Sequence, residues 1–252
     1  MARQRWVIKI GSQMLCDGGP ILIRALIQQV AWLKKHKIDV IWVTSGAIAT
    51  AKERVGRSDK ESLAKKQALS AIGQPLIMDL YNMALHSEGL LGAQVLLTYD
   101  DFKNKTRSQN LRNTLTQLLK MGTVPILNEN DAVSTEEIRF GDNDALSAKT
   151  AKLMGAKRLV ILTDVDGYFE SDPKKNKDAR LVSHLNKITA EVLKSVKSSR
   201  TSRNGSGGMY SKLLAAKEAA LAGIETWLIK GDAPRALIKT AQNEPIGTRI
   251  GK

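Results

Sequence analysis

Two lysines occupy positions where a phosphate would be a suitable partner. Lys9 lies near the end of an apolar segment, residues 6–10, where an ammonium group is costly to bury unless an anion meets it. Gly11 follows and leaves the backbone open to a phosphate. Lys212 comes just after residues 205–208 (GSGG), which lead into an expected helix. Loop N–H groups and the helix dipole can hold phosphates while this lysine reaches the transferred group.

Both features also have ordinary structural explanations. A lysine at the end of a strand can extend to water, and glycine-rich turns before helices are common. The spacing of residues 205–212 matches neither the P-loop pattern nor the dinucleotide-binding pattern, and the protein-kinase signatures are absent from the sequence. The glycine-rich segment by itself therefore identifies no fold.

Three polar segments follow apolar ones or open a helix: residues 44–47 (TSGA), 128–131 (NEND) and 141–144 (GDND). The first offers hydroxyls and backbone N–H groups to an anion, and Asp131 in the second could hold the ammonium group of an amino acid. Helix capping or a solvated turn would explain the same residues. The third segment, however, has two aspartates around Asn143 where a single cap would be enough.

The elements that must position these residues alternate along the chain. Short apolar runs typical of strands buried on both faces occur at residues 6–10, 40–43, 95–97, 124–127, 159–162 and 226–229. Amphipathic segments typical of helices lie between them, at residues 21–35, 62–86, 111–121, 145–154 and 210–222.

This alternation predicts an α/β fold, a three-layer α/β/α sandwich with a mainly parallel central sheet. In open parallel sheets, ligands bind beyond the carboxyl ends of the strands. All five polar and glycine-rich segments fall at such ends, and together they supply two lysines, carboxylates, hydroxyls and a glycine cradle. That combination suits phosphoryl transfer. We expect one domain over residues 1–252, with a loop-rich excursion at residues 171–208 that contains a short helix near residues 189–196.

Composition narrows the possible partners. The chain has 39 Lys and Arg against 25 Asp and Glu, a formal charge of +14, which suits nucleic acid, an anionic membrane or small anionic substrates. Aromatic residues make up only 4%, so platforms for stacking nucleic acid bases are scarce. We therefore expect neither nucleic acid nor membrane as a partner, and small anionic substrates remain.

Cysteine and histidine usage argues against redox and zinc chemistry. Cys16 is the only cysteine, and His36, His86 and His184 have no neighbours at metal-ligand spacing, so we expect no metal held by protein side chains alone. No apolar run is long enough for a signal or membrane segment. The expected location is the cytoplasm.

Several motifs together resemble the amino acid kinase family, over nearly the whole chain. They are residues 43–49 (VTSGAIA), 66–69 (KQAL) with Gly73 and Gln74, 128–133 (NENDAV), 141–144 (GDND), 162–164 (LTD) with Gly167, and 207–209 (GGM) with Lys212. The pair NENDAV and GDND is the most specific, and within the family it resembles members that phosphorylate glutamate.

The resemblance implies ATP with Mg²⁺ as cofactors and L-glutamate as the acceptor, giving γ-glutamyl phosphate in the first step of proline synthesis. It implies that Ser45, Asp131 and Asn143 contact glutamate. The implied nucleotide contacts are Lys9, Thr163, Asp164, Ser206, Gly207, Gly208, Met209, Tyr210, Ser211 and Lys212, to which the open backbone at Gly11 is added. Because negative charge spreads over the transferred phosphoryl group, we expect Lys9 and Lys212 to be catalytic, with Asp144 holding both ammonium groups in position.

Three further expectations come with the family. Proline is expected as a feedback inhibitor, and the chain is expected to form a homo-oligomer. Many members carry a C-terminal domain of the PUA type, and none is expected here after the strand near residues 248–250.

Two alternatives stay open at this point. The chain could be a sibling kinase that acts on N-acetylglutamate, aspartate or a nucleoside monophosphate. It could also be a nucleic-acid-binding or regulatory protein on the same scaffold, although both lysines and residues 141–144 are retained.

Overall fold

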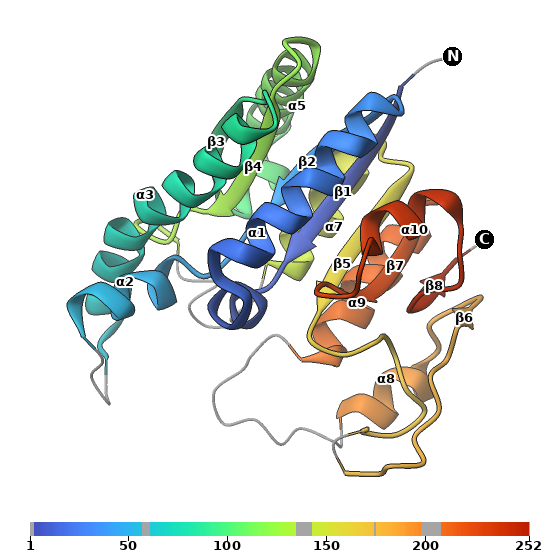
Figure 1. Cartoon of the computed structure of the whole chain (residues 1–252). Helices are drawn as coiled ribbons and strands as arrows, with labels where there is room; N and C mark the ends of the chain where they lie inside the picture. Colours follow the sequence, from blue (N-terminus) through green and yellow to red (C-terminus); the bar gives the residue numbers. More distant parts are fainter. Residues whose placement is uncertain (1–2, 57–60, 135–142, 174, 198–207, 252) are drawn as a thin grey trace.

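The computed structural model describes residues 3–56, 61–134, 143–173, 175–197 and 208–251. These residues contain one eight-stranded sheet in the order β3-β4-β2-β1-β5-β7-β8-β6 (Figure 1). All neighbouring strands pair in parallel except β7 and β8. The strands are β1 (Gln4–Ile10), β2 (Ile38–Val43), β3 (Gly92–Leu97), β4 (Val124–Glu129), β5 (Arg158–Thr163), β6 (His184–Leu185), β7 (Glu225–Lys230) and β8 (Thr248–Ile250).

Helices cover both faces of this sheet and form two separate apolar cores. Side chains of α1, α3 and α10 pack on one face, and those of α5, α7 and α9 pack on the other. The helices are α1 (Ser12–Lys35), α2 (Ala47–Val55), α3 (Leu63–Ser87), α4 (Asp100–Lys103), α5 (Lys105–Lys120), α7 (Asp144–Met154), α8 (Ala190–Lys197), α9 (Met209–Leu221) and α10 (Ala236–Gln242). The predicted three-layer α/β/α sandwich with a mainly parallel sheet is therefore confirmed.

The alternation of side chains along β1 decides where Lys9 points. Ile8 and Ile10 are buried against α1 and α3, whereas Val7 is buried in the core beneath α5, α7 and α9. Successive side chains in a strand point to opposite faces, so Lys9 shares the face of Val7. The ammonium group therefore faces the helices that follow the polar residues 141–144 and 205–208.

Several helix boundaries differ from the sequence-based expectation. Helix α1 begins at Ser12 rather than near residue 21, because residues before Pro20 already form helical turns and Gly19 absorbs a kink with φ of 49°. Helix α5 begins at Lys105, where the side chain of Asn104 caps it by accepting a hydrogen bond from the N–H of Arg107 at 3.0 Å. The pattern did not predict α10 or the two-residue strand β6.

The six predicted strands are all present, and the short helix expected near residues 189–196 is α8. Among the described residues, none of the helices is both long enough and apolar enough to cross a membrane.

Candidate active site

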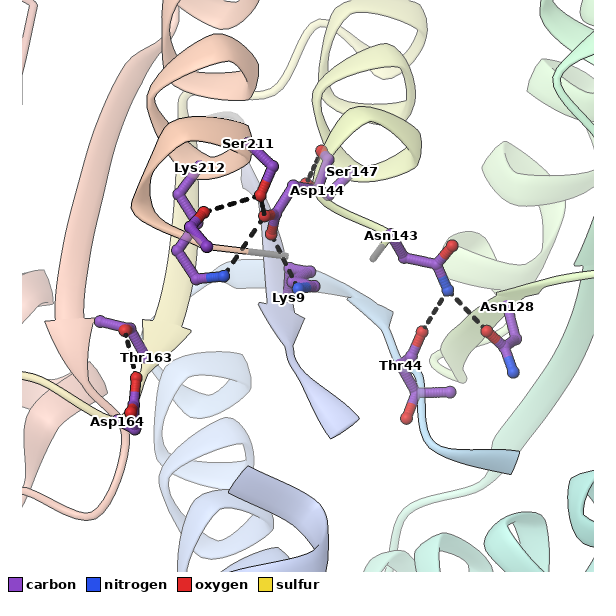
Figure 2. Close-up of polar contacts among 11 residues, drawn as sticks. Lys9, Thr44, Asn128, Asn143, Asp144, Ser147, Thr163, Asp164, Ser211 and Lys212 are labelled. Atoms are coloured by element: carbon purple, nitrogen blue, oxygen red, sulfur yellow. Dashed lines mark hydrogen bonds and ion pairs between the residues drawn. The ribbon is translucent and has the colours of Figure 1, made fainter. Parts of the chain in front are cut away.

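Three charged side chains from separate parts of the chain meet at the carboxyl end of β1. The Nζ atom of Lys9 lies 2.7 Å from Oδ1 of Asp144, and Nζ of Lys212 lies 3.3 Å from Oδ2 of the same carboxylate (Figure 2). Ser211 donates a hydrogen bond to that Oδ2 atom at 2.7 Å. Lys9, Asp144 and Lys212, predicted separately from β1, α7 and α9, are thus one buried cluster.

The cluster carries more positive than negative charge. Burial alone would raise the pKa of Asp144, but the ammonium groups of Lys212 and Lys9 and the hydrogen bonds from Lys9 and Ser211 hold it below its ordinary value. At neutral pH this carboxylate is therefore ionised and is no proton donor. Two ammonium groups around one carboxylate leave a site that attracts an anion.

The start of α9 supplies a surface for phosphates beside Lys212. Helix α9 begins at Met209, and its N-cap residue, Gly208, offers no side chain to cap the first N–H groups. Free N–H groups at a helix start favour anions. Tyr210 in this turn is half-buried. Ser206 and Gly207, also predicted to contact the nucleotide, lie outside the described residues, as do residues 141 and 142 of the GDND segment.

The remaining predicted nucleotide contacts lie around this start. A Cβ atom added to Gly11 would lie 3.5 Å from Nζ of Lys9, so the backbone at Gly11 runs close to the ammonium group. Thr163 ends β5 and donates a weak 3.3 Å hydrogen bond to the exposed Asp164. Figure 2 shows these two residues on the side of Lys212 that faces away from Asn143.

The site has a second half, built from side-chain amides. Gln74 Nε2 donates to Gln94 Oε1 at 3.4 Å, and Asn128 Nδ2 donates to Gln74 Oε1 at 2.8 Å. Asn143 Nδ2 in turn donates to Asn128 Oδ1 at 2.6 Å and to the carbonyl oxygen of Thr44 at 2.7 Å (Figure 2). Each amide oxygen accepts a hydrogen bond from the nitrogen of the next amide, so all the hydrogen bonds in this chain of amides run in one direction.

This direction determines what Asn143 presents to a ligand. Both N–H groups of its amide are used by Thr44 and Asn128. Its Oδ1 atom is buried and has no hydrogen-bond partner among the described residues. A buried acceptor without a donor is costly, so the position favours a ligand that donates a hydrogen bond.

Asp131 presents a second acceptor of this kind. Ser70 donates to Asp131 Oδ2 at 2.6 Å, while Oδ1 is buried without a hydrogen-bond partner in the described part of the chain. Burial raises the pKa of Asp131, and the hydrogen bond from Ser70 offsets part of that rise. Asp131 and Ser70 line a cavity of about 300 Å³, and Gln74 and Gln94 also lie in its wall.

Buried hydrogen bonds hold the loop that carries Ser45. Tyr81 OH accepts from Trp42 Nε1 at 3.0 Å and lies 2.9 Å from Thr44 Oγ1, and burial raises the pKa of Tyr81 to about 12. The loop turns at Gly46, whose φ of 93° favours glycine. Ser45 is thereby buried between β2 and α2.

Gly73 explains how α3 delivers its polar residues. A Cβ atom on Gly73 would lie only 1.8 Å from the carbonyl oxygen of Ala47, so only glycine lets α3 pack this closely on the start of α2. The next residue, Gln74, can then reach Asn128. Sequence reasoning gave no role to Gln74 or Ser70, although their four-residue spacing puts both on one face of a helix.

The comparisons with known proteins bear on the family of this chain. Residues 4–230 match the model of the amino acid kinase family. The chain is 41% identical over 252 residues to glutamate 5-kinase from Thermus thermophilus. The alignment covers 98% of this chain and 67% of that protein. The chain is 43% identical to glutamate 5-kinase from Meiothermus ruber, over 97% of this chain and 65% of that protein.

Solved structures show the same fold at lower identity. UMP kinase from Ureaplasma parvum superposes with a TM-score of 0.66 at 18% identity and covers 100% of both chains. Isopentenyl phosphate kinase from T. acidophilum gives a TM-score of 0.67 at 18% identity, over 98% of this chain and 99% of that one. The fold, the family match and the curated relatives agree: this chain belongs to the amino acid kinase family.

Proposed function

We propose that this chain transfers the γ-phosphoryl group of ATP to the γ-carboxylate of L-glutamate, forming γ-glutamyl phosphate in the first step of proline biosynthesis. Curated relatives between 39% and 43% identical over almost the whole chain are named glutamate 5-kinase. The site adds a physical reason for an acceptor with a free α-ammonium group rather than N-acetylglutamate.

The observation that carries the proposal is a pair of buried acceptors, Asp131 Oδ1 and Asn143 Oδ1, that have no hydrogen-bond donor among the described residues. A free α-ammonium group has three N–H donors and a positive charge, so it has enough donors for both oxygens and can neutralise Asp131. The amide of N-acetylglutamate has one N–H and an added acetyl group, and it would leave one acceptor buried without a donor. Sites of this kind reject analogues that leave buried polar groups unpaired.

The charged half suits the transfer itself. The ordinary pKa of a glutamate side chain is about 4.3, so at neutral pH the nucleophile is already a carboxylate and needs no general base. Lys9 and Lys212 stabilise the negative charge that spreads over the transferred phosphoryl oxygens, and Asp144 holds both ammonium groups in position. Asp144 therefore acts as an organiser of charge.

The residues present fit a nucleotide. The start of α9, whose N-cap Gly208 has no capping side chain, and the excess positive charge around Asp144 suit the phosphates of ATP, which supplies the transferred group when bound. The described residues contain no group of three or more His, Cys, Asp or Glu side chains that could hold a metal ion. Mg²⁺ often binds through substrate phosphates and few carboxylates, so we propose that it arrives with ATP.

The test is an assay of the purified protein that traps acyl phosphate as a hydroxamate. We expect ATP-dependent product with L-glutamate and far less with N-acetylglutamate or aspartate. Turnover with N-acetylglutamate that equals or exceeds turnover with glutamate would contradict the proposal.

Three further points belong to this proposal. Proline has a secondary ammonium with two N–H groups, which suits the same two acceptors, so millimolar proline should raise the KM for glutamate without lowering kcat. Glutamate curves that proline leaves unchanged would contradict this point. We also propose a homo-oligomer, checked by light scattering, and a cytoplasmic location, checked by cell fractionation.

A further inference from the structure

A second cavity lies at the amino ends of the strands, on the side of the sheet opposite to the charged cluster at their carboxyl ends. Its volume is about 470 Å³, compared with about 300 Å³ for the cavity beside Asp131. Its walls come from the starts of β1 and β2 and the last turns of α1 and α5, and Figure 1 shows the start of β1 beside the end of α1. We call it the amino-end groove and define it by Arg3, Arg5, Lys34, Lys35, Asp39 and Lys120.

The amino-end groove is separate from the active site. Arg5 and Lys9 lie on the same strand, four residues apart, which corresponds to about 13 Å at about 3.3 Å per residue. The active site lies at the carboxyl ends of the strands and the groove at their amino ends. A ligand of the groove would therefore not be the nucleotide or acceptor bound beside Asp144.

The groove has more cations than carboxylates. Among the described residues, five Lys and Arg side chains line it, against Asp39 and Glu88. Helices α1, α3 and α5 end in its wall, and each C-terminus contributes about half a negative charge, so the three together do not cancel the excess. Helix dipoles thus account for some of these cations but leave the groove positive.

The partners of these cations are mostly uncharged. Arg3 pairs with Asp39 at 2.6 Å, whereas Arg5 donates to the carbonyl oxygen of Met154 at 3.1 Å. The Nζ atom of Lys34 donates to the carbonyl oxygen of Thr123 at 3.3 Å. Carbonyl groups satisfy hydrogen bonds without neutralising charge, so the positive charges of Arg5 and Lys34 remain available to an anion.

Lys34 is the most telling of these side chains. It is half-buried, and burial lowers its pKa, an effect that Asp39 partly offsets and Arg3 reinforces. An anion in the groove would stabilise the ammonium form. The apolar side chains Leu90 and Leu119 also line the groove and reduce the screening of such an interaction by water.

We propose that the amino-end groove is a second binding site that takes a small phosphorylated molecule with at least two negative charges. Guanidinium groups bind phosphate oxygens in pairs, and lysines add point charges. The volume lies in the range of small-molecule sites. The described lining residues include no aromatic ring, so the phosphate rather than a stacked base is what the groove recognises.

The test compares two double variants that lose the same charge from the same two helices. Lys35→Ala with Lys120→Ala removes two exposed cations of the groove, and Arg24→Ala with Lys105→Ala removes two exposed cations elsewhere on α1 and α5. Calorimetry measures inorganic pyrophosphate binding at 150 mM salt, with the active site saturated by a non-hydrolysable ATP analogue. Thermal melting checks that each variant is folded.

We expect one saturable pyrophosphate site per chain that the groove variant weakens on the order of tenfold or more and the control leaves nearly unchanged. Equal weakening in both variants, or no saturable binding in the wild type, would overturn the proposal. Citrate is the carboxylate probe, and tighter binding of citrate than of pyrophosphate would rule out a phosphate site. A short RNA that competes more strongly than pyrophosphate would assign the groove to nucleic acid instead.

Discussion

The two halves of the active site solve opposite electrostatic problems. Around Asp144, three charges compensate one another and leave a net positive charge, and the carboxylate has a lowered pKa. Around Asp131 and Asn143, side-chain amides and the Ser70 hydroxyl lie near two oxygens that have no donor among the described residues, and the pKa of Asp131 is raised. The first half has an excess of positive charge that suits an anion, whereas the second half has acceptors that suit a hydrogen-bond donor.

This difference assigns different tasks to the two halves. Fixed charges are worth most where charge changes during reaction, so the cluster at Asp144 should act on kcat. Acceptors that meet an ammonium group contact a part of the substrate whose charge is constant, so Asp131 and Asn143 should act on KM. Variants that break this division test the comparison directly.

The largest expected effect is in the charged half. Lys9→Ala and Lys212→Ala should each lower kcat on the order of a hundredfold or more, about 3 kcal/mol for one preorganised electrostatic group, and Asp144→Asn should also lower it strongly. Initial rates at saturating ATP and glutamate measure the effect. The control is Lys152→Ala on the exposed face of α7. Near-normal kcat in both lysine variants would end the assignment of this half to the chemical step.

The next effect belongs to the acceptors. Asp131→Ala should raise the KM for glutamate by about ten- to a hundredfold, because a charged hydrogen-bonding group contributes about 1.5 to 3 kcal/mol, with kcat changed much less. Ser45→Ala should act in the same direction and more weakly. Asp79→Asn, an exposed carboxylate on α3, is the control. A loss confined to kcat would place Asp131 with the charged half.

Gln74 should affect glutamate binding indirectly, because it orients Asn128, which in turn orients Asn143. Gln74→Leu removes the oxygen that accepts from Asn128, so the direction of the amide chain is lost, and we expect the KM for glutamate to rise about tenfold. Gln94→Leu is the matched control, because it removes only the weakest link, at 3.4 Å. If both variants raise KM equally, the direction of the hydrogen bonds in the chain of amides is not what orients the amide of Asn143.

Sequence reasoning reached the two halves unequally, for a physical reason. Lys9, Asp144 and Lys212 could be predicted because burying a charged side chain at the end of a strand or helix costs free energy unless an opposite charge meets it, and charged residue types are visible in the sequence. The strands were predictable because buried parallel strands are continuous apolar runs. Neither cue marks an amide: Gln74 and Ser70 are ordinary polar residues of a long helix, and their roles depend on hydrogen-bond partners 54 and 61 residues away.

The helix starts show the same limit. The amphipathic pattern predicts a helix from residue 21, yet helix α1 begins at Ser12 and continues on both sides of the kink at Gly19. Local pattern gives the type of an element more reliably than its ends, because packing on the sheet decides where helical turns continue.

The smallest expected effect concerns pH, and it separates the two halves by the sign of their pKa shifts. Because the pKa of Asp131 is raised by burial, this carboxylate should gain a proton first as pH falls, and kcat/KM for glutamate should fall with it. Asp144, whose pKa is lowered, stays ionised to lower pH, so kcat at saturating glutamate should persist. The side chain of the substrate glutamate itself titrates near pH 4.3. Asp131→Asn removes the titrating group of the enzyme, so any fall in kcat/KM that remains in this variant comes from the substrate.

Ser70→Ala should then sharpen the distinction. The hydroxyl of Ser70 stabilises the ionised form of Asp131, so its removal should move the inflection of kcat/KM to higher pH. The profile of kcat should stay in place, and Ser87→Ala, near the other end of α3, should move neither. An inflection that stays or moves to lower pH in Ser70→Ala would mean that Ser70 does not act through Asp131, because a lost donor can only favour the protonated carboxyl.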